Sequence, residues 1–266
     1  MSARYVKPYV MRSKNDAADA EAICEAVTRP KMRFVPVKTR EAQALSLLHT
    51  ARIQPISQRT ALINCLRSCL AEFGIVYSRG QAGAIALLKD AAAANKRIPK
   101  LAKAAFVSIA AAIRTCEAQV TALDRELARV AKSDDTCARL ETIPGIGPVT
   151  ASTIMAIGGD LSRFSSGRGF SAWLGLTPRQ YSTGETVRLG PITKAGDKTL
   201  RSLLVVGALG LIRWAKSNPK EASPWLISLL DRRPPLVVAV AIANKNARTA
   251  WALVVRGGTY RFKPSV

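Results

Sequence analysis

Two adjacent hydroxyl side chains, those of Ser182 and Thr183, lie in a stretch of the sequence that is rich in basic residues. Cationic groups around a small hydroxyl could position a phosphodiester and neutralise its charge, as phosphoryl transfer to a serine requires. The same composition also suits a loop that only contacts nucleic-acid phosphates, and composition alone does not separate the two interpretations. The basic residues of this stretch are Arg179, Arg188, Lys194, Lys198 and Arg201.

Two acidic residues, Asp16 and Asp19, are three positions apart at the start of a predicted helix from about Asn15 to Thr28. This spacing places both carboxylates on one helix face, which continues through Ile23, so we expect the pair to face the protein interior. Buried paired carboxylates would indicate a divalent-metal site. The alternative, which spacing alone favours, is that both acids complement the helix dipole. Two carboxylates are also too few for a two-metal nuclease.

A third candidate is the glycine turn I-P-G-I-G within Leu140–Ala151, between two predicted short helices. Pro144, Gly145 and Gly147 make this turn tight, and the second helix begins at Pro148 with free amides. Such a turn can accept a phosphate through backbone N–H groups, as in helix-hairpin-helix proteins, which hold a nucleic-acid backbone without reading its sequence. The alternative is a plain corner in which glycine serves packing, and the surrounding positive charge favours phosphate binding.

The composition indicates a folded protein with a polyanionic partner. Forty Lys and Arg against 18 Asp and Glu give a net charge of +22, and 48% apolar residues exclude a disordered basic tail. Residues 161–266 hold 17 basic and 4 acidic side chains, a net charge of +13. We expect nucleic acid rather than a membrane as the partner, because the apolar stretch Leu203–Ile212 is too short to span a bilayer. No basic-then-apolar leader opens the chain, so we expect a cytoplasmic protein.

Cysteine and histidine usage argues against several kinds of site. The five cysteines include no C-x-x-C pair and are odd in number, which argues against a disulfide framework. One histidine without a cysteine cluster argues against structural zinc. A Ser-His-Asp or Cys-His mechanism would depend on His49, which follows Leu47 and Leu48 in a helical pattern and which we interpret as a packing residue.

The elements that must position these residues are predicted to be mainly helical. Residues Arg33–Thr39 read as a short strand or an extended crossover. The helix that follows is expected to be interrupted at Pro55 and to end at Gly74. After the helix at 15–28, the predicted helices are Arg40–Phe73, Gly80–Asn95, a long helix after Pro99, and Pro235–Val255.

The clearest periodicity lies after Pro99. Apolar residues there alternate spacings of three and four for more than three heptads, which favours a coiled coil over an ordinary amphipathic helix, because a globular helix normally drifts off a 3.5-residue period. The partner of this seam could be the Arg40–Phe73 helix or a second subunit. The seam consists of Phe106, Ile109, Ile113, Cys116, Val120, Leu123, Leu127 and Val130.

Four runs of sequence, taken in order, resemble the insertion sequence 110 family of transposases. The joint order of the motifs is more specific than any one of them, and the resemblance covers essentially the whole chain. The runs are K-N-D-A-A-D-A at 14–20, I-P-G-I-G at 143–147, G-L-T-P-R-Q-Y-S-T-G at 175–184 and I-T-K-A-G-D-K-T-L-R at 192–201.

The resemblance implies a mainly α chain in three parts. Residues 1–75 would be the C-terminal remnant of a RuvC-type, ribonuclease-H-like α/β nuclease domain with a DEDD metal site. Residues 76–134 would be a coiled-coil segment. Residues 135–266 would be a helical transposase domain with the helix-hairpin-helix at 140–151. Because family chains begin with segments that carry the first two acids, the resemblance also implies an N-terminal truncation, and we expect the truncated chain to be inactive alone.

The implied activity is DNA transposition and recombination by metal-assisted phosphoryl transfer. Asp16 and Asp19 match the third and fourth acids of the DEDD site and would hold Mg²⁺. The family's nucleophile position, immediately before the glycine, is Thr183, whereas the less hindered hydroxyl is that of Ser182, so both are candidates. The nucleic-acid contacts would come from Gly145, Gly147, Arg179, Arg188, Lys194, Lys198 and Arg201.

The implied partners are insertion-sequence DNA, a structured guide RNA and further copies of the chain, joined through the coiled coil. The implied location is the bacterial cytoplasm, in association with the nucleoid. The alternative is a non-catalytic nucleic-acid-binding protein that uses the helix-hairpin-helix and the basic surface.

Overall fold

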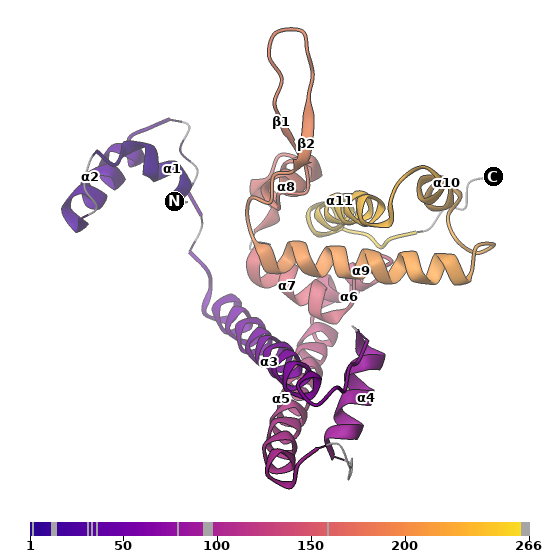
Figure 1. The fold of residues 1–266 in the computed structure, drawn as a ribbon. Helices are drawn as coiled ribbons and strands as arrows, with labels where there is room; N and C mark the ends of the chain where they lie inside the picture. The colour runs from indigo at the N-terminus through magenta and orange to yellow at the C-terminus, as the bar shows by residue number, and fades with distance from the viewer. Residues whose placement is uncertain are drawn as a thin grey trace. The chain divides into compact units, whose positions relative to one another are not determined.

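The structure, a computed structural model, is mainly helical, as predicted (Figure 1). It describes residues 1, 3–11, 15–30, 32, 34, 35, 37–78, 80–92, 98–158 and 160–261. The chain divides into two compact units, Met1–Glu41 and Ala42–Val266.

The N-terminal unit is built from short helices. It contains α1 (Ala3–Val6), a 3-10 turn at Lys7–Tyr9 and α2 (Asp16–Val27). Asn15 caps α2, because its Oδ1 accepts a hydrogen bond of 2.7 Å from the backbone N–H of Ala18, and the predicted helix start is confirmed. The described residues of the predicted strand or crossover at 33–39 form neither helix nor strand, while residues 33 and 36, like residue 14 of the acidic motif, lie outside the described residues.

The buried face of α2 differs from the predicted one. Ala22 and Ala26 are buried, whereas Ile23 is 46% exposed. Asp19 is half-buried at the edge of the covered face and Asp16 is exposed. The expectation that both carboxylates and Ile23 share an interior stripe is therefore wrong, because the two alanines, four residues apart, form the covered stripe instead.

The long helix α3 (Arg40–Ala71) runs through Pro55 without a break, so the predicted interruption is wrong. Pro55 is buried, and although a proline inside a helix removes one backbone hydrogen bond, the packing along the rest of the 32-residue helix keeps it continuous. The predicted end is confirmed. Gly74 has φ +68°, and the N–H of Ile75 donates to the carbonyl of Leu70 at 3.1 Å, which is the Schellman pattern.

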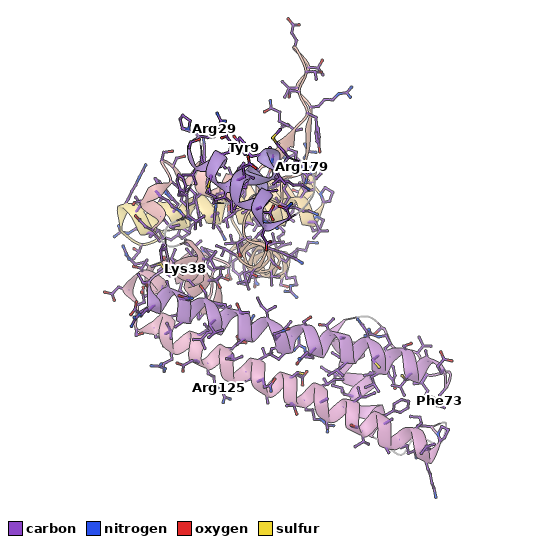
Figure 2. The ribbon with its side chains drawn as sticks, turned by 90° about the vertical axis from the view of Figure 1, so that its left-hand side faces the viewer. Tyr9, Arg29, Lys38, Phe73, Arg125 and Arg179 are labelled. Atoms are coloured by element: carbon purple, nitrogen blue, oxygen red, sulfur yellow. The ribbon has the colours of Figure 1, made fainter. Side chains whose placement is uncertain are left out.

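Helix α5 (Lys100–Lys132) lies antiparallel beside α3, and Figure 2 shows the two helices side by side. Arg52 forms an ion pair with Asp124 at one end of the pair. At the other end, the rings of Phe73 and Phe106 meet edge to face with centroids 5.9 Å apart. Helix α4 (Gln81–Ala92) also packs on α5, and residues 93–95 of its predicted range lie outside the described residues.

The apolar seam of α5 is covered within the chain. All eight of its residues are buried or half-buried. Phe106 and Ile113, for example, share a core cluster with Leu66 and Leu70 of α3. Of the two partners predicted for the seam, the Arg40–Phe73 helix is the one that the structure places against it.

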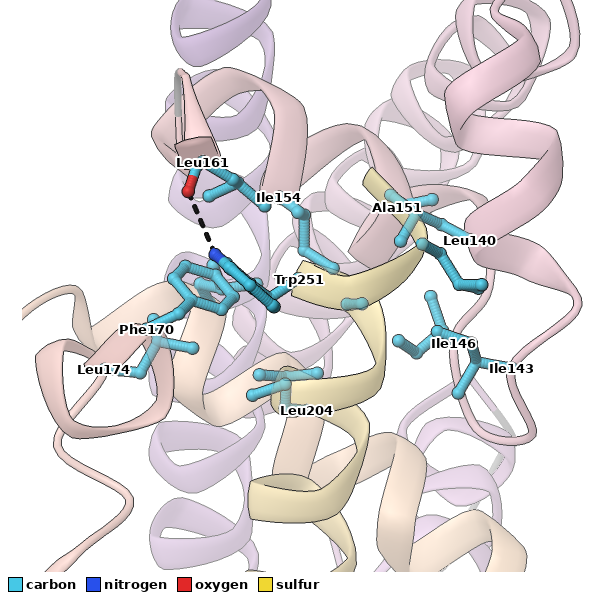
Figure 3. Close-up of a cluster of buried hydrophobic side chains, with 14 of the residues drawn as sticks. Leu140, Ile143, Ile146, Ala151, Ile154, Leu161, Phe170, Leu174, Leu204 and Trp251 are labelled. Carbon is cyan, nitrogen blue, oxygen red and sulfur yellow. Dashed lines mark hydrogen bonds between the residues drawn. The ribbon is translucent and has the colours of Figure 1, made fainter. Parts of the chain in front are cut away.

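The C-terminal part of the second unit packs around its last helix. Helix α11 contacts α9, α8 and α6, and the indole N–H of Trp251 donates to the carbonyl of Leu161 at 3.0 Å (Figure 3). The predicted end of the last helix near Val255 is confirmed, because α11 ends at Arg256, just before Gly257, which has φ +78°. The helices of this part are α6 (Asp135–Glu141), α7 (Pro148–Gly158), a 3-10 turn (Leu161–Arg163), α8 (Gly167–Trp173), α9 (Lys198–Ser217), α10 (Pro224–Arg232) and α11 (Pro235–Arg256).

This part also contains a two-stranded antiparallel hairpin, β1 (Pro178–Gln180) and β2 (Leu189–Ile192), which the prediction of a helical transposase domain did not include. The hairpin projects from the helices next to α8 (Figure 1). The local signal for it is the S-T-G-E turn at 182–185. The strands are short, β1 is exposed throughout and β2 alternates between exposed and half-buried residues, so hydrophobic alternation gives only a weak signal.

Candidate functional site

The two candidate hydroxyl residues lie in the connection between β1 and β2. This connection continues the ladder beyond the strands, since the N–H of Tyr181 donates to the carbonyl of Arg188 at 2.8 Å. Thr183 and Thr186 then exchange backbone hydrogen bonds of 3.2 and 3.1 Å, and Gly184, with φ +55°, allows the chain to reverse between them. The hairpin therefore holds its end in a defined shape.

Ser182 and Thr183 differ in what their side chains contact. Ser182 is half-buried, and its Oγ accepts a hydrogen bond of 3.3 Å from the backbone N–H of Arg188 on the opposite side of the connection. Thr183 contributes its backbone to the turn, and its side chain is exposed. The hydroxyl with the fixed position is that of Ser182.

Four of the five predicted basic residues are exposed. Arg179 donates to the carbonyl of Thr193 at 3.3 Å, across the base of the hairpin. The fifth, Arg201, is half-buried, and its Nη1 donates to the carbonyl oxygens of Leu174 at 2.9 Å and Ala195 at 2.6 Å. Arg201 thus joins the segments on either side of the hairpin, and its remaining N–H groups are the ones that could meet a phosphate. The exposed residues are Arg179, Arg188, Lys194 and Lys198.

The glycines of the two C-terminal motifs close the base of the hairpin. Gly175 has φ +72° and Gly196 has φ +67°. A Cβ on Gly175 would overlap the backbone of Ala195, and a Cβ on Gly196 would overlap the carbonyl of Trp173. Asp197 then caps α9 by accepting from the N–H of Leu200 at 2.7 Å. Lys194 and Lys198 flank this closed joint.

The α6–α7 turn uses its two glycines differently. Gly145 has φ +86° and lies against the backbone of Gly207 in α9, where a Cβ would come within 3.0 Å of the Gly207 carbonyl oxygen. The amide of Asn246 donates to the carbonyl of Pro144 at 2.8 Å and fixes the same turn. Gly147 has open space around it. Gly145 therefore serves packing, as the alternative interpretation of this motif expected, while Gly147 is free of such a constraint.

Asn246 was missed by the sequence reasoning. It is buried in α11 and positions the α6–α7 turn through its amide. The helix holds two asparagines, Asn244 and Asn246, and the sequence alone does not show which of them is buried and needs a partner inside the protein.

Asp16 and Asp19 lie in the first turn of α2, in the N-terminal unit. Their carboxylate oxygens are of the type that Mg²⁺ prefers, and Mg²⁺ sites often use one or two carboxylates together with phosphates. Among the residues that the structure describes, no group of three His, Cys, Asp or Glu side chains could hold a metal ion. The pair therefore presents two carboxylates without a third such ligand among the described residues.

His49 is a buried packing residue, as predicted, between α3 and α7. Its Nε2 lies 3.2 Å from the Oγ of Ser152, and its Nδ1 lies 3.2 Å from the Oγ1 of Thr153. Burial, together with the positive charge of Arg52, lowers the pKa of His49 to about 4, so the ring is neutral at pH 7. The ring contacts these two hydroxyls of α7 and not those of the β-hairpin.

Helix α5 is long and apolar enough to cross a membrane by length and composition, the one such helix in the described part of the chain. Core helices of folded domains pass the same test. Because α5 supplies Phe106 and Ile113 to a core that it shares with α3, its composition is weak support for a membrane span.

Two protein-family models match this chain, one in its N-terminal part and one in its C-terminal part. A family model described as "Transposase IS116/IS110/IS902 family" matches residues 137–223, which include the α6–α7 turn and the β-hairpin. A second model, described as a transposase, matches residues 1–75.

Several relatives match along almost the whole chain. A Pseudomonas aeruginosa protein named "Probable family 20 transposase" is 45% identical over 263 residues, which are 98% of this chain and 78% of that protein. The transposase for insertion sequence element IS1111A of Coxiella burnetii is 39% identical over 266 residues, 98% of this chain and 72% of that protein. The transposase for insertion sequence element IS1328 of Yersinia enterocolitica is 39% identical over 263 residues, 98% of this chain and 77% of that protein.

Identity at this level, over more than two thirds of each relative, agrees with the match of the family model to the hairpin region. The chain belongs to the IS116/IS110/IS902 family of transposases.

Proposed function

We propose that this protein recombines insertion-sequence DNA by a covalent step at Ser182. The observation that carries the proposal is the position of the Ser182 hydroxyl, which the N–H of Arg188 holds on a hairpin that projects from the helices. Exposed guanidinium groups at Arg179 and Arg188 supply positive charge on the same two strands. A fixed hydroxyl with cations nearby is what attack on a phosphodiester requires.

In the proposed step, the Oγ of Ser182 attacks the phosphorus of a DNA strand. The Oγ–P bond forms, the bond from phosphorus to one deoxyribose oxygen breaks, and that oxygen leaves as a hydroxyl with the serine proton. Arg179 and Arg188 stabilise the negative charge that develops on the phosphoryl oxygens. Attack of another DNA hydroxyl on the phosphoserine then restores Ser182 and joins the new strand.

Asp16 and Asp19 are the proposed Mg²⁺ ligands, in a RuvC-like DEDD domain. When bound, the ion would neutralise phosphate charge and make a coordinated oxygen more acidic. The support is the oxygen donor type and the three-residue spacing at the start of α2.

The remaining proposed contacts hold nucleic acid. The support is the exposure of Lys194 and Lys198 beside the hairpin, and the open space around Gly147 at the α6–α7 turn, which suits a helix-hairpin-helix contact with a phosphate. Arg201 would contact nucleic acid through the guanidinium N–H groups that do not donate to the carbonyl oxygens of Leu174 and Ala195. A structured guide RNA, self-association and a cytoplasmic, nucleoid-associated location complete the proposal.

Trapping of a covalent adduct tests this function. The full chain is incubated with Mg²⁺ and a labelled duplex that carries the DNA flanking its gene, and adducts that survive denaturing electrophoresis are counted. We expect Ser182→Ala to eliminate the adduct and Thr183→Ala to reduce it less, with Thr186→Ala, an exposed residue of the same turn, as the matched control. The reverse ranking would assign the attack to Thr183, and an adduct that persists in the Ser182→Ala/Thr183→Ala double variant would remove the hairpin from catalysis.

A non-catalytic nucleic-acid-binding protein is the second candidate. The burial of the single histidine favours it, because His49 is neutral and engaged with α7 and thus offers no base to the hairpin hydroxyls. Salt-dependent DNA binding without any covalent adduct would support this candidate over the first.

A further inference from the structure

A cavity of about 360 Å³ opens where α9, α10 and α11 meet. Figure 1 shows these three helices next to one another in the C-terminal part of the chain. Pro144 of the α6–α7 turn and Tyr260, which follows α11, complete its wall. The cavity is separate from the β-hairpin that carries Ser182, because none of its lining residues belongs to that hairpin.

The wall of the cavity contains two exposed indoles. Trp214 of α9 and Trp225 of α10 are each 43% exposed, although tryptophan is a side chain that folding usually covers. The Nζ of Lys245 lies 4.6 Å from the ring centroid of Trp225, a cation–π contact that keeps a positive charge at the cavity. Aromatic faces beside a fixed cation are the features that recognise a base and its phosphate.

We infer that this cavity binds an unpaired nucleobase of a single-stranded nucleic acid, with the base against Trp214 and Trp225 and the adjoining phosphate at Lys245. The inference rests on the proposed function to the extent that nucleic acid is taken as the partner. Beyond the phosphate contacts of the proposed function, the cavity would hold one nucleic-acid strand by a base as well as by its backbone.

The charge of the surroundings and the chemistry of the lining fit this occupant. Residues 161–266 carry a net charge of +13, which attracts a polyanion. Glu221 lies in the same wall, where a carboxylate accepts hydrogen bonds from the N–H groups of a base and repels a bare phosphate. The lining is otherwise largely apolar, which suits the flat face of a base and not a hydrated ion.

Binding of labelled oligonucleotides to the full chain tests the inference. The probes are single-stranded DNA and single-stranded RNA of about 12 nucleotides, an abasic strand with the same number of phosphates, and a duplex. We expect both base-containing strands, or one of them, to bind more tightly than the abasic strand. Trp225→Ala should weaken this binding roughly tenfold, Trp225→Phe should keep most of it, and Lys245→Met should lower the salt slope by about one.

The matched control is Val206→Ala, which removes an exposed apolar side chain of α9 that does not line the cavity. Circular dichroism of each variant checks that the helices are intact. Equal binding of abasic and base-containing strands, or an unchanged affinity in Trp225→Ala, would overturn the inference. If the duplex still binds in that case, the proposed function is not affected. Failure of every probe, the duplex included, would overturn both. Preference for RNA or for DNA would identify the source of the base.

Discussion

The backbone of Gly207, in the middle of α9, lies directly against the carbonyl of Gly145 in the α6–α7 turn. A Cβ on either residue would press on the other's carbonyl group, so two glycines far apart in the sequence form one contact. Because of this contact, the turn that resembles a phosphate-binding hairpin is also a packing surface for α9.

The first prediction follows from this contact. Gly207→Ala should destabilise the protein by about 1–3 kcal/mol, because the clash with Gly145 outweighs the gain of about 1 kcal/mol that alanine brings to a helix. The control is Gly210→Ala in the same helix, where the space is open and a gain of up to about 1 kcal/mol is expected. Urea unfolding measures both changes, and a Gly207→Ala variant as stable as Gly210→Ala would contradict the packing role.

The second prediction concerns pH. The unfolded chain binds a proton at His49 near its usual pKa of 6.5, whereas the folded chain binds it only near 4. Between pH 4 and pH 6.5 the unfolded state therefore binds more protons than the folded state. The contribution of neutral His49 to the free energy of unfolding is fully present above pH 6.5 and decreases by roughly 3 kcal/mol as the pH falls toward 4. His49→Gln, which keeps polar atoms for Ser152 and Thr153, should lose less stability over the same range. Parallel slopes for the variant and the unaltered protein in urea unfolding would refute this linkage.

The third prediction concerns the seam between α3 and α5. Replacing Val120 and Leu123, both half-buried, with aspartate places two charges in an apolar contact and should melt the helix pair, with a loss of helix signal in circular dichroism. Thr121→Asp, at an exposed position of the same helix, is the control and should keep the signal. Light scattering on the same samples reports whether the seam also joins subunits.

The fourth prediction concerns the hairpin cations. Arg188→Ala should weaken duplex binding about equally for all DNA sequences and lower the slope of log K against log salt by about one, because one phosphate contact is lost. Arg129→Ala removes an arginine whose charge is already paired with Glu126, and its slope should stay the same. Equal slopes for Arg188→Ala and the unaltered chain would exclude Arg188 from the phosphate contacts.

Features that depend on neighbouring residues could be predicted from the sequence. The start of α2 near Asn15 and the ends of α3 at Gly74 and of α11 near Val255 each depend on hydrogen bonds within a few residues, and all three lie where the prediction placed them. The mainly helical fold and the buried seam follow from the same local periodicity.

Features that depend on distant residues could not be predicted. Pro55 is tolerated because packing keeps α3 continuous, and the partner of Gly145 is Gly207 in another helix. The hairpin around Ser182 was missed because its strands are only three and four residues long and mostly exposed, which leaves little hydrophobic pattern. The acids at 16 and 19 show a further limit, since helix spacing alone does not say which face is covered.

The closed joint at the base of the hairpin has a consequence for the entropy of the reaction. Gly175 and Gly196 fit against backbone atoms, and Arg201 links the carbonyls of Leu174 and Ala195. This joint fixes the base of the hairpin, and the hydrogen bond from the N–H of Arg188 limits the freedom of the Ser182 hydroxyl in the folded chain, before any substrate arrives. In the covalent step proposed for Ser182, a docking substrate therefore meets a hydroxyl already in place, and only the substrate's own freedom is left to lose.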